Sequence, residues 1–387
     1  MAMDRWWLHI QAIIWRMLMR IGMVFHDFPF PSPPPPSFSR KVYPSVSSHG
    51  SKGTLKLRFY TPKGYEKARE TGKKYPVVVN FHGGGFCLGS ATDDTRWARS
   101  VTDEVDAVFV SVDYHLAPEY PFPAAVDDGV EALLYLAANA EELGIDPHKI
   151  SLTGFSAGGN LAFTVALRLQ YYAMKTTSNT GSTSSTSSDL IEEPDSHTTF
   201  LTHKPPHQST TTTATTTTPL PASQLPTLLT SSLSIISIFS WYPILDFHTP
   251  RSHRRAQCEF PEKTLPTFFT DLFDESYLPH HPSRTSPYAS PYLASSEILA
   301  ASLPHDIFIY MCEWDMLLHE GQGFVKRLEG LGMRVRGMMI EEAPHAWDKS
   351  PNPFRDQESI DLFYRQACAD MRAVFEQHGG VEGGGGG

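Results

Sequence analysis

The feature that most constrains this chain is a serine set between glycines, in the stretch Leu152-Thr153-Gly154-Phe155-Ser156-Ala157-Gly158-Gly159-Asn160. It reads G-x-S-x-G, with a short β-like run before it and an apolar helical run after it. Strand, tight turn and helix together are the context of a nucleophile elbow, in which a serine hydroxyl is presented bare to a base. The turn also puts the Ala157 N–H at a helix N-terminus, where it can face an oxyanion. On this motif alone, a glycine-rich turn without chemistry remains the alternative.

Alternating or β-branched runs predict strands at 42–45, 54–60, 75–81, 107–114, 149–152, 233–242, 306–312 and 335–341. Helical patterns fall at 92–104, 124–143, 161–172, 267–277, 323–331 and 356–377. Strands that alternate with helices imply an α/β fold with a mostly parallel sheet covered on both faces.

Composition divides the chain of 387 residues into four kinds of segment. Residues 1–40 hold an apolar helix and the extended proline-rich spacer 29–36; residues 41–174 and 231–378 form the α/β domain. Between its two parts, residues 175–230 are dominated by serine and threonine, and we expect a disordered surface insertion, because such a segment buries too little apolar surface to order itself. Residues 379–387 form a flexible glycine-rich tail.

Charge and cysteine content exclude several classes of protein. The net charge of −10 argues against nucleic acid as a partner. The four cysteines lack C-x-x-C spacing, which predicts reduced thiols in the cytoplasm and neither a disulfide framework nor a zinc site. The histidines at 248, 253, 280 and 281 match no zinc spacing either, and we interpret them as surface histidines. We therefore expect no metal and no cofactor; no oligomeric state follows from the sequence.

The segment 5–27 predicts an amphipathic helix. Its charged and polar side chains fall within a stripe about 60° wide: Arg5, His9, Arg16, Arg20 and Asp27. The length suffices for a membrane span, but an arginine near the centre of the hydrocarbon costs about 2.5–3.5 kcal/mol. A secretory signal fits poorly, because no small-x-small cleavage site follows. The open alternatives are a lid docked over the α/β domain and a helix in a membrane interface; we expect docking with some peripheral membrane contact.

A serine nucleophile needs oxyanion donors, and three glycines after the strand 75–81 provide them. The run Asn80-Phe81-His82-Gly83-Gly84-Gly85-Phe86 leaves backbone N–H groups unshielded, and an HGGG loop is the oxyanion loop of lipases and esterases. We assign Gly83 and Gly84 as donors together with Ala157, and His82 and Gly85 as support of the loop. A phosphate cradle is the alternative, but no P-loop lysine follows.

The triad also needs a carboxylate and a base. Asp315 follows the strand 306–312 and would orient the histidine; Glu313 and Asp246 are its rivals. His345 follows the last predicted strand and stands third in the order serine, aspartate, histidine that this kind of fold uses. His319 and His305 are weaker candidates for the base, because they flank or precede the acid.

Four motifs together resemble the hormone-sensitive lipase family of α/β-hydrolases. They are His82-Gly83-Gly84-Gly85-Phe86, Asp113-Tyr114-His115-Leu116-Ala117-Pro118-Glu119 with Phe122-Pro123-Ala124-Ala125, the elbow Gly154 to Asn160, and Asp315-Met316-Leu317-Leu318-His319-Glu320-Gly321. The resemblance implies an eight-stranded sheet and a helical cap, built here from residues 1–40 and about 247–300. It also implies a serine carboxylesterase with the triad Ser156, Asp315 and His345.

Three positions depart from the family's motifs. Phe155 replaces an aspartate before the serine, His115 replaces an arginine, and His319 replaces an aspartate in the acid segment. None removes a catalytic group, so they bear on the support of the elbow and the shape of the pocket.

We therefore expect hydrolysis of short- to medium-chain acyl or aromatic esters, with a small-molecule ester as the partner. One alternative is a non-catalytic ligand-binding homologue, since the chain is also similar to the gibberellin receptor, a relative without the catalytic histidine. Another is a membrane-associated scaffold that uses residues 5–27 and the Ser/Thr-rich insertion 175–230.

Overall fold

Eight strands form one twisted sheet in the computed structural model, which describes residues 4–28, 32–45, 53–180, 228, 232–349 and 351–378. The strand order is β1-β2-β4-β3-β5-β6-β7-β8. The strands are β1 (Phe38–Val42), β2 (Leu55–Tyr60), β3 (Tyr75–Phe81), β4 (Val108–Asp113), β5 (Ile145–Phe155), β6 (Ile235–Trp241), β7 (Asp306–Trp314) and β8 (Arg334–Pro344). β1 and β4 both pair antiparallel with β2, and all other neighbours run parallel. The predicted α/β fold with a mostly parallel sheet is confirmed.

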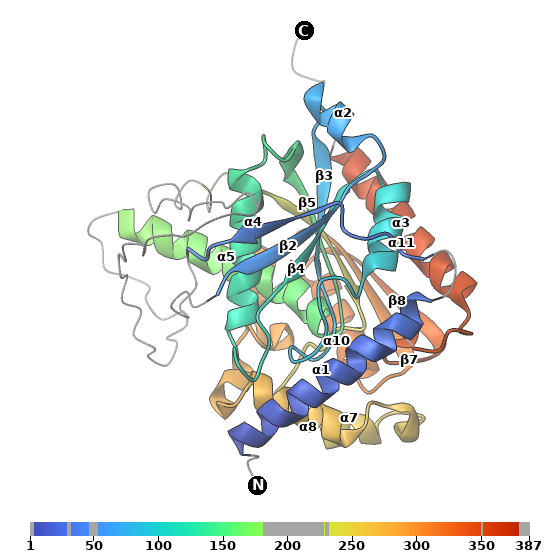
Figure 1. Ribbon diagram of the computed structural model, residues 1–387. Helices are drawn as coiled ribbons and strands as arrows, with labels where there is room; N and C mark the ends of the chain where they lie inside the picture. The colour runs from blue at the N-terminus through green and yellow to red at the C-terminus, as the bar shows by residue number, and fades with distance from the viewer. Residues whose placement is uncertain are drawn as a thin grey trace, which may run out of the picture.

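Helices cover both faces of this sheet (Figure 1). They are α1 (Arg5–Asp27), α2 (Tyr65–Glu70), α3 (Thr95–Glu104), α4 (Ala124–Ala138), α5 (Ala157–Thr180), α7 (Arg251–Ala256), α8 (Thr267–Tyr277), α9 (Ser296–Ser302), α10 (Leu318–Gly330) and α11 (Gln357–Gln377). Short 3-10 helices are η1 (Pro261–Lys263), η2 (His281–Thr285), η3 (Pro291–Leu293) and η4 (Trp347–Lys349).

The alternation of side chains along β3 explains the two layers. Val77 and Val79 pack into one apolar core with α4, α5 and α10, whereas Val78 packs into the other with α3 and α11. A strand buried on both faces needs apolar residues at consecutive positions, which is why 75–81 reads as a nearly continuous β-branched run.

A cap of α1, α7 and α8 lies beyond one end of the sheet, at the bottom of Figure 1. α1 packs on α8, although more than two hundred residues of sequence separate them. The predicted helix at 5–27 is thus present, and it is docked on the protein.

Several element boundaries differ from the sequence expectation, among them those of β1, α4, β5, α5 and α10. The first strand is Phe38–Val42, whereas 42–45 was expected; Phe38 pairs with Phe59 and stacks on its ring at 4.5 Å, while Pro44 has no N–H to give a ladder. α5 continues to Thr180, into the range expected for the insertion. Most of that expected insertion (181–227 and 229–230) and the glycine-rich tail (379–387) lie outside the described residues.

Candidate active site

Ser156 stands in a strained turn between β5 and α5. Its φ is 54°, in the left-handed region, and its N–H donates to the Trp241 carbonyl at 2.8 Å. A Cβ at Gly154 would run into the backbone of Gly158, and a Cβ at Gly158 would run into the carbonyl of Phe81. Glycine is required at both positions because strand and helix approach too closely for any side chain, and this is what lets the serine project from the turn.

His345 and Asp315 form a hydrogen-bonded chain with this serine. The Ser156 Oγ lies 2.8 Å from Nε2 of His345, and Nδ1 of the same ring donates to Oδ2 of Asp315 at 2.6 Å. The three residues follow β5, β7 and β8, whose parallel register brings their carboxyl ends to one edge of the sheet. The side chains of His345 and Asp315 are 4% and 2% exposed, so the pair is shielded from water.

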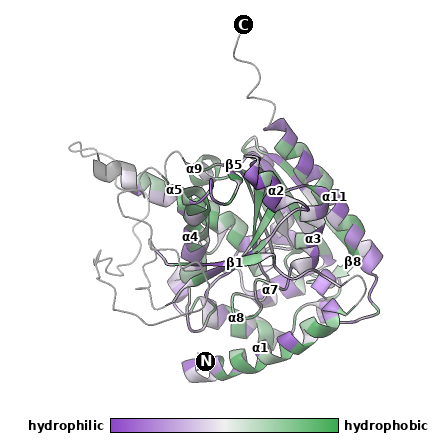
Figure 2. Cartoon of the chain, turned by 45° about the horizontal axis from the view of Figure 1, so that its top comes forward, coloured by the Kyte–Doolittle hydropathy of each residue, from purple (hydrophilic) through white to green (hydrophobic). Residues whose placement is uncertain are grey.

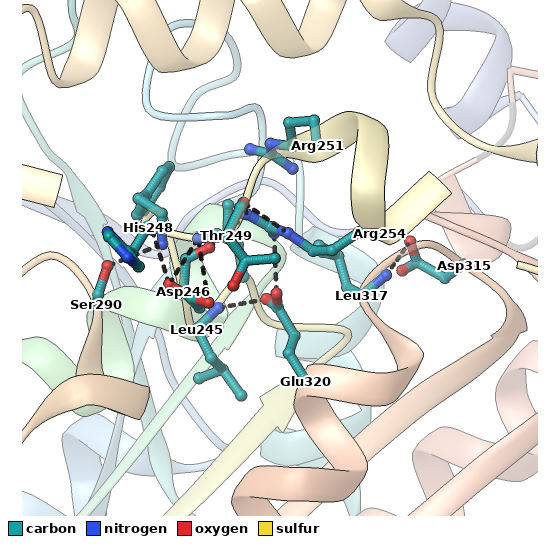
Figure 3. A network of polar contacts seen from close by, with 12 residues as sticks. Leu245, Asp246, His248, Thr249, Arg251, Arg254, Ser290, Asp315, Leu317 and Glu320 are labelled. Carbon is teal, nitrogen blue, oxygen red and sulfur yellow. Dashed lines mark hydrogen bonds and ion pairs between the residues drawn. The ribbon is translucent and has the colours of Figure 1, made fainter. Parts of the chain in front are cut away.

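The rival candidates have other partners. Asp246 accepts hydrogen bonds from the N–H groups of His248 and Thr249, which makes it a turn residue (Figure 3). Glu313 accepts the N–H of Glu342 at 2.7 Å. His319 lies 3.3 Å from the Gln257 carbonyl, and His305 precedes β7 at its amino end, away from Asp315.

The glycine loop after β3 lies against the elbow. Gly84 and Gly85 have φ values of 116° and 60°, which favour glycine, and a Cβ at Gly84 would run into the Leu88 carbonyl. A Cβ placed on Gly83 would be 3.1 Å from the Phe155 carbonyl oxygen. Ala157 begins α5, so its N–H is among the unpaired donors of a helix N-terminus. The structure thus brings Gly83 close to the turn that carries Ser156, and Gly85 lines the same pocket as the serine.

His82 is fully buried beneath this loop. Its Nδ1 donates to the Gly83 carbonyl at 2.8 Å, and its ring stacks on Tyr114 with centroids 4.2 Å apart. The Tyr114 hydroxyl in turn donates to the His82 carbonyl at 2.8 Å. These contacts hold the start of the loop from both sides.

A buried polar network beneath the elbow was missed by the sequence analysis. The hydroxyls of Tyr242 and Tyr364 donate to the two oxygens of Asp348 at 2.5 and 2.6 Å. The Tyr242 ring also meets the ring of His345 edge to face at 5.0 Å. Because Asp348 follows His345 by three residues, the network fixes the loop that carries the histidine.

Lys349 joins this network to the elbow itself. Its Nζ is 2.8 Å from Asp94 and 3.9 Å from the centroid of the Phe155 ring. Burial opposes its charge, but the attraction of Asp94 and Asp348 outweighs that cost and raises the pKa of Lys349. One feature of the sequence pointed to this network, namely the departure at Phe155. The family's motif has an aspartate at this position, whereas here the Phe155 ring faces the Lys349 cation.

A pocket opens over Ser156. It is lined by Gly85, Phe86, Ser156, Ile244, Phe247, Arg251, Leu265, Phe273, Asp315, Met316, Leu317 and His345. Several of these come from the cap, and no local pattern identified them. The lining is mostly apolar, which suits a hydrocarbon or aromatic group.

The cap's polar network braces one wall of the pocket (Figure 3). Arg254 pairs with Glu320 at 2.9 Å, and Glu320 accepts the Leu245 N–H at 2.7 Å. Burial raises the pKa of Glu320 to about 7. Leu317, the N-cap residue of the helix that carries Glu320, donates its N–H to Asp315 at 3.1 Å and so orients the Asp315 carboxylate.

Within the described ranges, no three His, Cys, Asp or Glu side chains are grouped as a metal site. The four cysteines are free, and burial raises the pKa of the Cys87 thiol to about 12, which keeps it protonated. α1 is long and apolar enough to cross a membrane by length and composition.

Comparisons with known proteins agree with this architecture. A family model described as the alpha/beta hydrolase fold matches residues 78–217 and 221–349. A similar solved structure is the Pyrobaculum calidifontis esterase, with a TM-score of 0.65 and 23% identity, covering 96% of this chain and 94% of that one. At that identity the likeness shows the fold alone.

Some curated relatives match over longer segments and some over shorter ones: the arylacetamide deacetylase of Oryctolagus cuniculus is 28% identical over 318 residues, 75% of this chain and 71% of that protein. The carboxylesterase NlhH of Mycobacterium tuberculosis is 48% identical over 91 residues, which are 24% of this chain and 28% of that protein. The hormone-sensitive lipase of Ictidomys tridecemlineatus is 38% identical over 109 residues, 28% of this chain and 14% of the lipase. The matched part spans less than a third of the length of NlhH and of the lipase.

Proposed function

Because the chain belongs to the alpha/beta hydrolase fold family and is similar to hormone-sensitive lipase, we propose that it is a carboxylesterase with Ser156 as its nucleophile. The observation that carries the proposal is the hydrogen-bonded chain from Ser156 through His345 to Asp315. The likeness to the carboxylesterase NlhH supports the same reaction class.

In this mechanism, His345 removes the Ser156 proton through Nε2 as the oxygen attacks the ester carbonyl carbon. Asp315 holds the ring by its Nδ1–H and stabilises the imidazolium that forms. The N–H groups of Gly83, Gly84 and Ala157 stabilise the oxyanion; loss of one such donor typically costs about 10²–10³ in rate. His345 then protonates the leaving alcohol, and water attacks the acyl-enzyme by the reverse path.

The pocket argues for the substrate class. Its apolar lining, with the rings of Phe86, Phe247 and Phe273, suits short- to medium-chain acyl or aromatic esters.

The proposal extends to location and partners. The free cysteines support the cytoplasm as the compartment, and the apolar helix α1 supports peripheral contact with a membrane.

The test is hydrolysis of p-nitrophenyl esters of graded acyl length by the full chain and by Ser156→Ala. We expect wild-type turnover to fall by roughly 10⁴-fold or more in the variant, with a maximum at short to medium chains. Equal rates for wild type and variant on every ester would contradict the esterase. Saturable binding of such esters without turnover would then support the ligand-binding alternative.

A further inference from the structure

α1 carries a broad apolar face that the protein leaves uncovered. Ten side chains project from one side of α1, within an arc of about 140° when viewed down the helix axis. All ten are apolar, and each is 38% to 68% exposed. This set, called the outer face below, is Trp6, Trp7, Ile10, Ile13, Ile14, Met17, Leu18, Ile21, Val24 and Phe25. α1 lies along the bottom edge of the molecule in Figure 2, largely in the hydrophobic colour.

The opposite side of α1 is pinned to the α/β domain. Leu8 and Ala12 are buried, and Arg16 donates to the Cys87 carbonyl at 2.7 Å and to the Ala117 carbonyl at 2.8 Å. The same guanidinium donates hydrogen bonds to both carboxylate oxygens of Glu119, at 2.7 and 2.8 Å. A helix crossing a bilayer would have to break all of these bonds and carry Arg16 into hydrocarbon, so the docked helix can only lie flat against a surface.

A row of aromatic rings leads from α1 to the pocket. Trp15 stacks on Phe268 of α8 at 5.4 Å and meets Phe269 at 4.5 Å. Phe269 stacks on Phe273 at 5.8 Å, and Phe273 lines the pocket against Gly85 of the glycine loop. Phe268 is itself 48% exposed, so the apolar surface continues from α1 onto α8.

We propose that the outer face of α1 docks flat on a phospholipid membrane and that the pocket receives esters dissolved in that membrane. The arc contains no charged residue, and it places Trp6 and Trp7 at one end, where indoles favour the lipid–water boundary. An arc of about 140° is wider than the narrow seam by which two helices pair, and it suits immersion in a lipid interface. The occupant is therefore a lipid surface and not a second copy of the helix.

The second half of this inference rests on the proposed esterase function; the docking half does not. Docking would hold α8 and the aromatic row at the membrane, so an apolar ester could pass to Ser156 along a shielded route. Hydrolysis of esters held in a bilayer should then depend on the outer face, whereas hydrolysis of freely dissolved esters should not.

The docking test is co-sedimentation of the full chain with phosphatidylcholine vesicles. The double variant Ile13→Gln, Met17→Gln places polar groups midway along the outer face and should bind at least about tenfold more weakly. The matched control is Leu293→Gln, Met339→Gln, two exposed apolar residues on η3 and β8 (39% and 42%), which should bind like wild type. Binding should change little with salt, because the face is uncharged.

Three results would overturn the docking proposal: a wild type that does not sediment, a double variant that binds as well as wild type, or a control that loses binding equally. A wild-type dimer that becomes monomeric in the double variant, without vesicle binding, would make a second copy the occupant and overturn it too. Ser156→Ala should bind vesicles like wild type, which separates docking from catalysis.

The delivery test compares a p-nitrophenyl ester in buffer with a long-chain ester held in the vesicles. The double variant should keep its rate on the first and lose about tenfold on the second. Equal losses on both, or on neither, would overturn delivery from the membrane. If wild type hydrolyses neither ester yet binds vesicles, the esterase proposal fails while the docking proposal stands.

Discussion

α1 and α11 are two long amphipathic helices that the tertiary structure treats in opposite ways. α11 buries its apolar stripe, including Ile360, Tyr364 and Met371, against α3 and β6. α1 buries only Leu8, Ala12 and His26 and leaves a larger apolar face exposed. The periodicity of apolar residues therefore predicts a helix and its apolar side, but it does not say what covers that side.

The polar side chains that anchor the two helices differ in the same way: the anchor of α11 is buried, and the anchor of α1 is partly exposed. Tyr364 of α11 enters a closed network with Asp348 and Lys349 beneath the elbow. Arg16 of α1 holds its partners at the surface, where its side chain is 20% exposed and that of Glu119 is 35% exposed. Removal of a buried anchor leaves its charged partner unpaired and out of reach of water. The partner of a surface anchor can still be hydrated when the anchor is removed.

The largest effect is expected from Lys349→Met. It strips Asp94 and Asp348 of their buried cation and should lower the free energy of unfolding by about 3–5 kcal/mol. It should also lower kcat, because Asp348 holds the loop of His345. Urea unfolding and ester hydrolysis measure the two effects, with the exposed Lys326→Met as control. A loss no greater than that of the control would show that the network is dispensable.

The second prediction compares the same substitution, methionine to alanine, on each of the two helices. Met371→Ala on α11 should cost about 2–5 kcal/mol, because Met371 is fully buried and its truncation leaves a cavity. Met17→Ala on α1 should change stability by less than about 0.5 kcal/mol, because Met17 is 59% exposed. Thermal unfolding in the absence of lipid measures both. Equal losses would mean that α1 is packed as closely as α11, which would erase the difference between them.

The third prediction concerns the anchor of α1. Arg16→Met removes its bonds to Cys87, Ala117 and Glu119 and should cost about 1–2 kcal/mol, less than the loss of Lys349. Limited proteolysis should then cleave near α1 sooner than in wild type. The exposed Arg20→Met serves as control, and identical cleavage of both variants would argue that packing alone holds the helix.

The smallest effect, and one that depends on pH, is expected at His115. Its hydrogen bond to Asp128 raises the pKa of His115 above 6.5. The stabilisation is therefore full below that value and is lost as the pH rises through the folded-state pKa. His115→Gln should cost about 1 kcal/mol near pH 6 and less near pH 9, whereas the loss from Lys349→Met should persist at both. A pH-independent loss at His115 would point to packing instead of charge.

Much of the fold and the candidate site followed from local patterns. The hydrophobic runs predicted the sheet and most of its helices, since a strand buried on both faces must be apolar throughout. The glycines at 84, 154 and 158 marked the two turns, because only glycine tolerates those backbone angles or approaches. The proposed triad was selected by its positions after predicted strands, and the structure brings its three members together.

Other features needed the folded chain. Lys349 meets Asp94 and Phe155 only because three distant segments converge, and no periodicity encodes such a meeting. The wall formed by Phe273, Leu265 and Arg251 likewise arises where the cap folds over the sheet.

The sequence by itself determined the serine elbow, the order of the proposed triad and the helix 5–27, because each depends on backbone geometry or spacing within a short segment. Only the tertiary structure decided which face of that helix would be covered. The hydrogen bonds of Arg16 to the Cys87 carbonyl and to Glu119 hold α1 in an orientation in which ten apolar side chains point outward. The orientation of α1 depends on contacts with residues far along the chain. The hydrophobic stabilisation of a helix depends on how much apolar area its neighbours remove from water, which the sequence of the helix alone does not give.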